Sequence, residues 1–173
     1  MTLSAKARRI KAVILDVDGV LTDGRFGYGV GDGEIKFFHA RDGHALKLLQ
    51  RAEIRTGILS GRSSEANTRR AQELSMDFVY QGEKDKGEAF DRLLAAADLE
   101  AGEVLYVGDD LVDLPVLRRA GVGVAVADAI PEAKATADWT TTEKGGHGAV
   151  REVAVWLLKE QGRWESVFAR YAP

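Results

Sequence analysis

The chain has 173 residues, enough for one domain with a full hydrophobic core and short for two. Its 24 basic and 27 acidic residues give a formal net charge of −3, and no concentrated run of Lys or Arg predicts binding to a nucleic-acid backbone. No apolar stretch has the length of a membrane span or a secretory signal, and cysteine is absent, so we expect a cytoplasmic protein without membrane association or thiolate chemistry.

Short apolar runs alternate with amphipathic segments along the chain. The predicted strands are 12–16, 56–60, 77–80, 104–108 and 122–126. The predicted helices are 44–53, 64–74, 86–97, 114–120 and 149–161. Continuous Val, Ile and Leu content is typical of strands buried on both faces of a parallel sheet. The pattern therefore predicts a doubly wound parallel α/β sheet in a single domain, 1–173.

One long connection, residues 17–41, interrupts this alternation. It is rich in glycine, and its segments 25–28 and 34–38 are predicted to pair as a β-hairpin across the turn 29–33. The hairpin is thus an insertion after the first strand, at about 24–39. Long connections in compact domains tend to be functional.

Polar residues with one chemistry in common follow four of the predicted strands. They are Asp16 and Asp18, Ser60, Lys86, and Asp109, Asp110 and Asp113. In an open parallel sheet, ligands bind beyond the carboxyl ends of the strands, so we expect these side chains to meet there. Clustered carboxylates repel one another unless a cation neutralises them. Because no His or Cys lies among them, the pattern predicts Mg²⁺.

Two of these assignments have simpler alternatives. Asp and Gly mark turns in any protein, so the D-x-D-G stretch at Asp16 is only a moderate signal by itself. Lys84 competes with Lys86 for the role of phosphate-binding lysine. Lys86 is favoured because Asp85 and Glu88 form a predicted helix cap, which makes Lys86 the first residue of the helix.

Taken in order, these motifs resemble those of the haloacid dehalogenase superfamily of phosphatases. D-V-D-G-V-L-T-D at 16–23 is similar to its first motif, S-G-R at 60–62 to its second, Lys86 to its third, and G-D-D-L-V-D at 108–113 to its acidic fourth. The resemblance implies a Rossmann-like fold of the haloacid dehalogenase type. It also implies an aspartyl-phosphate intermediate on the first aspartate of the D-x-D pair.

The same resemblance assigns a role to each motif residue. Asp16 would be the nucleophile, and Asp18 would protonate the leaving group and later deprotonate water. Ser60 and Lys86 would hold the phosphoryl oxygens. The metal ligands would be Asp16, the backbone carbonyl of Asp18, Asp109, and Asp113 through a bound water. Asp110 is left open between a supporting role and a simple helix-terminal charge.

The chain has no room for a cap domain, either in 17–41 or between the second and third motifs, so it resembles the capless group. Within that group it most resembles the family of 3-deoxy-D-manno-octulosonate 8-phosphate phosphatases. Seven segments spread along the chain carry this resemblance: D-G-V-L-T-D-G at 18–24, G-E-I-K-F-F at 33–38, A-R-D-G at 40–43, Y-Q-G-E-K-D-K at 80–86, V-G-D-D-L-V-D-L-P-V at 107–116, V-A-V-A-D-A at 124–129 and G-G-H-G-A-V-R-E at 145–152. The implied partner is a small sugar-acid phosphate. The candidates for binding its carboxylate are Arg41, Arg62 and Arg151, because a guanidinium group can bind a carboxylate through two hydrogen bonds. His147 is a further candidate for contact with the substrate.

The family resemblance also implies a homotetramer in which the hairpins of neighbouring subunits stand in for the cap. The hairpin carries Phe26, Tyr28, Ile35, Phe37 and Phe38, more apolar surface than a lone ribbon keeps exposed. Three alternatives stay open: a nine-carbon sugar-acid 9-phosphate as substrate, a receiver-type signalling module, and a nucleic-acid end-processing phosphatase. The receiver type accepts phosphate on a later strand, and the acidic balance argues against the nucleic-acid enzyme. The tail 162–173 matches no pattern.

Overall fold

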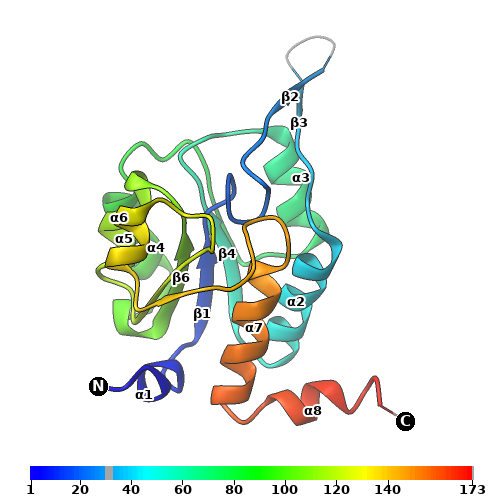
Figure 1. Cartoon of the computed structure of the whole chain (residues 1–173), viewed down its shortest axis with the longest axis vertical. Coiled ribbons are helices and arrows are strands. Elements are labelled where there is room, and N and C mark those ends of the chain that lie inside the picture. Colours follow the sequence, from blue (N-terminus) through cyan, green and yellow to red (C-terminus); the bar gives the residue numbers. More distant parts are fainter. Residues whose placement is uncertain (30–32, 173) are drawn as a thin grey trace.

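The computed structural model describes residues 1–29 and 33–172. A six-stranded sheet runs through the centre of the molecule, in the order β5-β4-β1-β6-β7-β8, and every pair of neighbouring strands in it is parallel (Figure 1). Its strands are β1 (Ala12–Leu15), β4 (Arg55–Leu59), β5 (Phe78–Tyr80), β6 (Val104–Gly108), β7 (Val122–Ala125) and β8 (Trp139–Thr140). β1, β6 and β7 are buried along their whole length, as their apolar sequences predict.

Helices cover both faces of this sheet (Figure 1). On one face lie α2 (Ala40–Arg51), α3 (Glu65–Glu73) and α7 (Ala149–Glu160), and on the other lie α4 (Lys86–Ala97), α5 (Leu114–Leu117) and α6 (Pro131–Thr136). The ends of the chain add α1 (Leu3–Ala7) and α8 (Trp164–Phe168), and short 3₁₀ turns form at Ala101–Glu103 and Leu111–Asp113. The predicted doubly wound parallel α/β fold is confirmed.

The start of α4 shows how local sequence places a functional residue. The side chain of Asp85 accepts a hydrogen bond from the backbone N–H of Glu88 (3.0 Å), so the helix begins at Lys86 as predicted. Apolar residues then recur at helical spacing, and Phe90 and Leu93 are fully buried. The cap therefore fixes the backbone of Lys86 at the carboxyl end of the sheet.

The insertion after β1 is a short hairpin that projects from the body of the molecule (Figure 1). Its strands are β2 (Gly27–Tyr28) and β3 (Glu34–Ile35), joined by a hydrogen bond from Gly29 N to Gly33 O (2.8 Å). Pairing is shorter than the predicted 25–28 and 34–38, and residues 30–32 of the predicted turn lie outside the described residues. Only α3 and β5 lie between Ser60 and Lys86, so no cap domain is inserted there.

Some predicted boundaries were wrong for identifiable reasons. α2 begins at Ala40 instead of residue 44, because buried Asp42 in its first turn accepts hydrogen bonds from Gly148 N (3.2 Å) and Arg151 N (2.8 Å) at the start of α7. This contact joins positions far apart in the sequence, so local pattern does not reveal it. α5 ends at Leu117 instead of residue 120. Four elements were not predicted: α1, α6, the two-residue β8, and α8.

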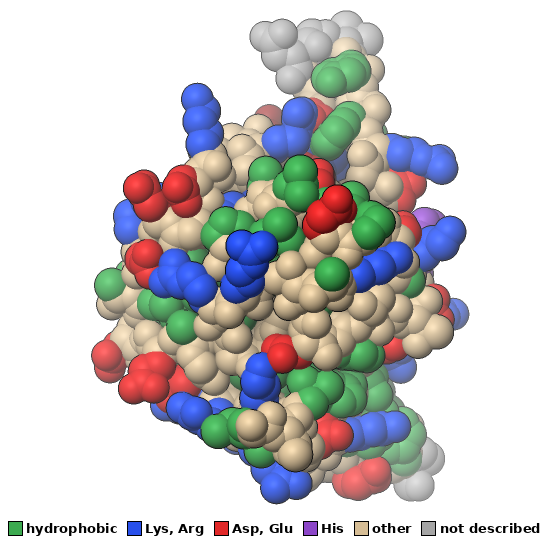
Figure 2. Space-filling model, turned by 60° about the vertical axis from the view of Figure 1, so that its left-hand side comes forward, with side chains coloured by type: hydrophobic (Ala, Val, Ile, Leu, Met, Phe, Trp, Pro, Cys, Tyr) green, Lys and Arg blue, Asp and Glu red, His purple; other side chains and the backbone are tan. Residues whose placement is uncertain are grey.

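Charged side chains of both signs are interspersed on the face drawn in Figure 2, and hydrophobic side chains reach the surface near the projecting hairpin at the top. The large apolar residues exposed on that hairpin are Phe26, Tyr28, Ile35 and Phe37. Among the helices of the described residues, none combines the length and apolar character that crossing a membrane requires.

Candidate active site

The candidate site lies where the direction of strand order reverses. From β1 the chain adds β4 and β5 on one side, then returns to place β6 on the other side of β1. Asp16 directly follows β1 and Asp109 directly follows β6, so both lie at the carboxyl end of this switch point. Asp16 N also donates to Val107 O (2.9 Å), which extends the pairing of the two strands to the site itself.

A tight turn after β1 shapes the floor of the site. The N–H groups of Leu21 and Thr22 both donate to Val17 O, at 2.9 and 3.0 Å. Gly19 has a φ of +94°, and a Cβ placed on it would lie 2.1 Å from Oδ2 of Asp109. The glycine of the D-x-D-G motif therefore makes room for a carboxylate that comes from β6.

A buried network of charges connects three of the motifs. Nζ of Lys86 lies 2.7 Å from Oδ1 of Asp16 and 2.6 Å from Oδ1 of Asp113. The hydroxyl of Tyr106 on β6 also donates to Oδ1 of Asp113 (2.5 Å). Oδ2 of Asp113 accepts from the backbone N–H groups of the two residues after β6, Asp109 (2.9 Å) and Asp110 (3.2 Å). Asp113 thereby holds both Lys86 and the loop that carries Asp109.

Burial and mutual repulsion shift the titration of these groups. Desolvation raises the pKa of Asp16 to about 6, although Lys86 opposes the shift. Desolvation, together with the charges of Asp16 and Asp113, raises the pKa of Asp109 to about 8. Burial alone would lower the pKa of Lys86, but the two carboxylates beside it outweigh burial and the net shift is upward. Asp16, Asp109 and Asp113 together thus carry more negative charge than Lys86 balances.

The donor set fits a hard divalent cation. One carboxylate oxygen from each of Asp16, Asp109 and Asp113 lies within 4.8 Å of the other two. Oδ1 of Asp109 is buried and has no hydrogen-bond partner among the described residues. Four hydrogen bonds from the protein already engage both oxygens of Asp113. Asp16 and Asp109 therefore have oxygens more readily available for direct contact with a cation.

The hollow above these residues measures about 540 Å³. The sequence-predicted residues that line it are Asp16, Asp18, Ser60, Arg62, Lys86 and Asp109, together with Asp110. Ser60 is buried, and its hydroxyl accepts from Arg62 N (3.3 Å), so the turn after β4 directs it into the site. Lys84 also lines the hollow but is exposed. The structure therefore brings all four predicted motifs to one place.

The hairpin brings three side chains to the site that were not predicted to belong to it, Lys36, Glu34 and Phe26. Nζ of Lys36 lies 2.5 Å from Oδ1 of Asp18. Glu34 pairs with Arg62, which itself lies 3.8 Å from Oδ2 of Asp18. The ring of Phe26 stacks over the Arg62 guanidinium at 4.2 Å. The alternation of charged and apolar residues in E-I-K-F at 34–37 was an available signal, because it places Glu34 and Lys36 on one side of the strand.

Three predicted substrate-binding residues lie elsewhere in the single chain. Arg41, His147 and Arg151 line a separate hollow of about 790 Å³ beside α7 that does not include Asp16.

The glycines next to His147 allow close packing against the turn after β1. A Cβ on Gly145 would lie 1.7 Å from Gly19 O, and Gly146 N donates to Val20 O (2.9 Å). The G-G-H-G stretch therefore supports the turn after β1 from behind.

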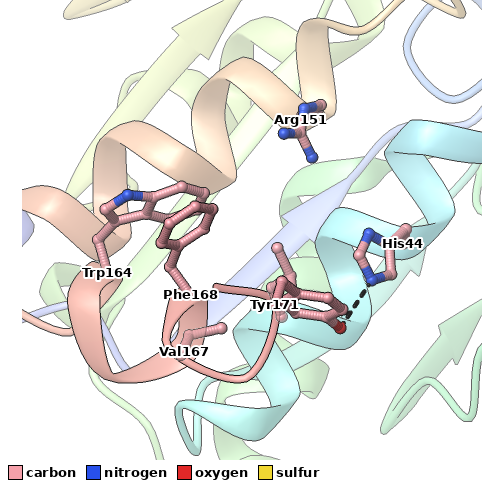
Figure 3. Close-up of a pocket in the computed structure, with 7 residues that line it drawn as sticks. His44, Arg151, Trp164, Val167, Phe168 and Tyr171 are labelled. Atoms are coloured by element: carbon pink, nitrogen blue, oxygen red, sulfur yellow. Dashed lines mark hydrogen bonds between the residues drawn. The ribbon is translucent and has the colours of Figure 1, made fainter. Parts of the chain in front are cut away.

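A further small cavity, about 200 Å³, forms where α8 folds back over α2 and α7 (Figure 3). Trp164 and Phe168 stack at 5.6 Å between ring centroids, and the Tyr171 hydroxyl hydrogen-bonds Nε2 of His44 (3.0 Å). None of the carboxylates of the D-x-D pair or the acidic motif lines this cavity. It shows how the tail, for which the sequence predicted no element, is held against α2 and α7.

The chain is similar in sequence and fold to known phosphatases. A family described as haloacid dehalogenase-like hydrolases matches residues 64–153. The 3-deoxy-D-manno-octulosonate 8-phosphate phosphatase of Escherichia coli K12 is 43% identical over 159 residues, covering 92% of this chain and 85% of that protein. The cobalt-bound phosphatase of the same name from Haemophilus influenzae is 41% identical, with a TM-score of 0.88 and coverage of 92% and 93%.

The crystal structure of the Moraxella catarrhalis 3-deoxy-D-manno-octulosonate 8-phosphate phosphatase, in complex with magnesium ion, phosphate ion and KDO, is 39% identical to this chain. It superimposes with a TM-score of 0.94 and covers 97% of each chain. These similarities extend over nearly the whole length and include the strand ends that carry the acidic motifs. The chain belongs to the haloacid dehalogenase-like hydrolases, in their capless group.

Proposed function

We propose that the protein is a Mg²⁺-dependent phosphatase that hydrolyses 3-deoxy-D-manno-octulosonate 8-phosphate through an aspartyl-phosphate on Asp16. The observation that carries this proposal is the placement of Asp16 against Lys86 (2.7 Å), in a hollow also lined by Asp18, Ser60 and Asp109. A relative with magnesium, phosphate and the sugar acid in one crystal structure supports the same substrate and metal.

In the first half-reaction, a carboxylate oxygen of Asp16 attacks phosphorus in line with the sugar oxygen. The bond from phosphorus to that oxygen breaks, and Asp18 gives its proton to the departing alkoxide. Lys86 and Ser60 hold non-bridging phosphoryl oxygens as charge spreads over them. Asp16, with a pKa of about 6, is mostly ionised at neutral pH and so is available as nucleophile.

In the second half-reaction, water replaces the enzyme oxygen on phosphorus. Asp18, now a carboxylate, accepts a proton from the attacking water, and the bond between phosphorus and Asp16 breaks. Inorganic phosphate leaves, Asp16 is again a carboxylate, and Asp18 is again protonated. The proton given to the sugar in the first step is thus recovered from water in the second.

Mg²⁺ would be held by Asp16, Asp109 and the backbone carbonyl of Asp18, with Asp113 acting through water, and when bound it offsets the repulsion between a carboxylate nucleophile and a phosphate dianion. The unpartnered oxygen of Asp109 and its raised pKa support this assignment. Asp113 also orients Lys86, so it serves the site in two ways.

The proposal includes assembly as a homotetramer in the cytoplasm, with hairpins shaping neighbouring sites. Tyr28 and Phe37 are 81% and 76% exposed in the single chain, which supports a partner surface over the hairpin. Arg41, His147 and Arg151 lie outside the hollow of their own chain, so any contact between them and the substrate would require a neighbouring subunit or a large movement. Arg62 is the one predicted substrate-binding residue inside the hollow.

Purified protein should release phosphate from the eight-carbon 8-phosphate with Mg²⁺ and lose this activity in EDTA. A parallel assay with the nine-carbon sugar-acid 9-phosphate decides between the two substrates, and higher kcat/KM for the nine-carbon compound would overturn the substrate assignment. Stable phosphorylation without turnover would instead indicate the receiver-type alternative. Binding to DNA at low salt would favour nucleic-acid end processing.

A further inference from the structure

In segment 34–37, which consists of β3 and the two residues after it, the charged side chains face inward and the apolar side chains face outward. This is the reverse of an ordinary surface strand. The side chains of Glu34 and Lys36 are 12% and 0% exposed, whereas Ile35 and Phe37 are 48% and 76% exposed as residues. A surface strand usually turns its apolar residues inward and its charges to water. Here the charges point into the molecule, toward the candidate site, so they require an explanation other than packing.

The inward lysine ends on a specific atom. Nζ of Lys36 lies 2.5 Å from Oδ1 of Asp18 and 3.5 Å from Oε2 of Glu34, with the ring of Phe26 at 5.6 Å. On the other side, Nε of Arg62 lies 3.8 Å from Oδ2 of Asp18. The carboxylate of Asp18 is therefore held between two cations, and one of them is completely buried.

We propose that Lys36 is a positioning residue that orients Asp18 for proton transfer to the leaving oxygen. The proposal rests on the proposed function, in which Asp18 acts as general acid and base. Burying a lysine is costly, and an apolar side chain would serve a purely structural position at least as well. Proton transfer, in contrast, loses efficiency steeply when the donor is misplaced by about 1 Å.

Lys36 acts through Asp18 and does not itself exchange a proton. Its ammonium group fixes one carboxylate oxygen, and this leaves the other oxygen of Asp18 facing Arg62 and the hollow. The proton passes from Asp18 to the alkoxide as the phosphorus–oxygen bond breaks, and Asp18 regains it from water. Because Lys36 directly follows β3, the hairpin becomes part of the catalytic arrangement and is more than a surface for subunit contact.

The test compares two substrates of similar size that differ in how much they need a general acid: phenyl phosphate and 4-nitrophenyl phosphate. Lys36→Met should lower kcat/KM for phenyl phosphate by about 10- to 100-fold and affect kcat/KM for 4-nitrophenyl phosphate several-fold less, because kcat/KM reports the first half-reaction, in which nitrophenolate leaves without a proton. In the Asp18→Asn background, Lys36→Met should add little further loss. Lys36→Arg, which keeps a cation, should recover part of the phenyl phosphate activity.

Lys84→Met is the matched control. Lys84 is an exposed lysine that lines the hollow containing Asp16, and among the described residues it makes no ion pair or hydrogen bond with Asp18. It should not change the ratio of the two kcat/KM values. Circular dichroism and Mg²⁺ affinity, measured by calorimetry, should be the same for Lys36→Met and wild type. If Lys36→Met does not fold, Lys36→Gln takes its place in every comparison.

Three results would overturn the role of Lys36. They are equal losses of kcat/KM on both aryl phosphates, losses of kcat/KM that multiply fully with those of Asp18→Asn, and a raised KM for the sugar-acid phosphate with unchanged kcat, which would make Lys36 a substrate-binding residue. Failure of the proposed function looks different. In that case the wild-type protein itself would hydrolyse none of these phosphates, or Asp16→Asn would remain active.

Discussion

Nζ of Lys86 lies 2.7 Å from Oδ1 of Asp16, and both side chains are almost completely buried. The same ammonium group lies 2.6 Å from Asp113, so one lysine bridges two carboxylates that repel each other. A capped helix start places the lysine, and the carboxyl ends of β1 and β6 place its two partners. The position of Lys86 therefore depends on local sequence as well as on the order of strands in the sheet.

Replacing Lys86 by Met should lower both stability and turnover. Two buried carboxylates would lose their counter-charge, which costs about 3–5 kcal/mol of unfolding free energy, and the phosphoryl oxygens would lose a donor. Chemical denaturation in EDTA and phosphate release with Mg²⁺ measure the two effects. Lys84→Met is the comparison, since Lys84 is exposed and should cost less than about 0.5 kcal/mol. The opposite ranking of the two variants would assign the third motif to Lys84.

Stability and metal affinity should depend on pH in opposite directions. The pKa values of Asp16 (about 6) and Asp109 (about 8) are raised in the folded protein, so it holds protons that the unfolded chain has already released. The contribution of these groups to stability is complete below the unfolded pKa of about 4 and is lost as pH rises through about 6 and then about 8. In EDTA, the melting temperature should fall over this range.

Mg²⁺ should therefore raise the melting temperature more at about pH 8 than at about pH 5.5, because binding must displace those protons. Calorimetry in buffers with different ionisation enthalpies should detect proton release at the lower pH. Asp109→Asn removes the group with the larger shift, so in this variant the melting temperature in EDTA should depend less on pH. Equal stabilisation by Mg²⁺ at both pH values would contradict the assignment of these carboxylates to the metal.

Gly19→Ala should weaken Mg²⁺ binding through Asp109. The added Cβ would meet Oδ2 of Asp109 at 2.1 Å, so the carboxylate would have to move. Gly24→Ala is the control: Gly24 also has a positive φ (+77°), but the nearest atom to its Cβ would be 3.7 Å away. Both variants should lose about 1 kcal/mol of stability from backbone strain. Only Gly19→Ala should also lose about tenfold or more in Mg²⁺ affinity by calorimetry, and equal affinities would show that Asp109 does not need its present position.

The sequence predicted the sheet well because its strands are short, apolar and separated by amphipathic helices. It did not reveal the first turn of α2, where Asp42 binds the start of α7. It also missed α8, whose aromatic residues pack against α2 and α7 from the far end of the chain. In both cases a stabilising contact reaches α2 from a segment more than 100 residues away in the sequence, and period and propensity describe only neighbours along the chain.

The site residues also fall into those that local sequence predicts and those that depend on contacts between distant segments. Asp16, Ser60, Lys86 and Asp109 were predictable because each directly follows a strand or opens a helix. Lys36 was not, since its role depends on the hairpin folding back over the loop that carries Asp18. Arg41, His147 and Arg151 remain predicted substrate-binding residues. As arginines and a histidine they suit a carboxylate, and the first residues of α2 and the segment that leads into and begins α7 place them in another hollow of the same chain.

Assembly through the hairpin predicts that Tyr28→Ser with Phe37→Ser will dissociate the tetramer and lower kcat/KM. These side chains are the most exposed aromatics of the hairpin, so burial against other subunits stabilises the complex through apolar area. Light scattering reports the mass, and Phe168→Ser on α8 controls for removing an exposed aromatic elsewhere. A wild-type protein that is fully active at the monomer mass of 18.8 kDa would contradict this assembly.

Phosphoryl transfer to Asp16 is tested most directly by mass spectrometry of protein quenched in acid during turnover. The wild type should carry one phosphoryl group, on the peptide that contains Asp16. Asp16→Asn should show no adduct and lose activity by many orders of magnitude while its fold remains intact. An unmodified wild type together with an Asp16→Asn variant that keeps about a tenth of the activity would contradict the covalent mechanism.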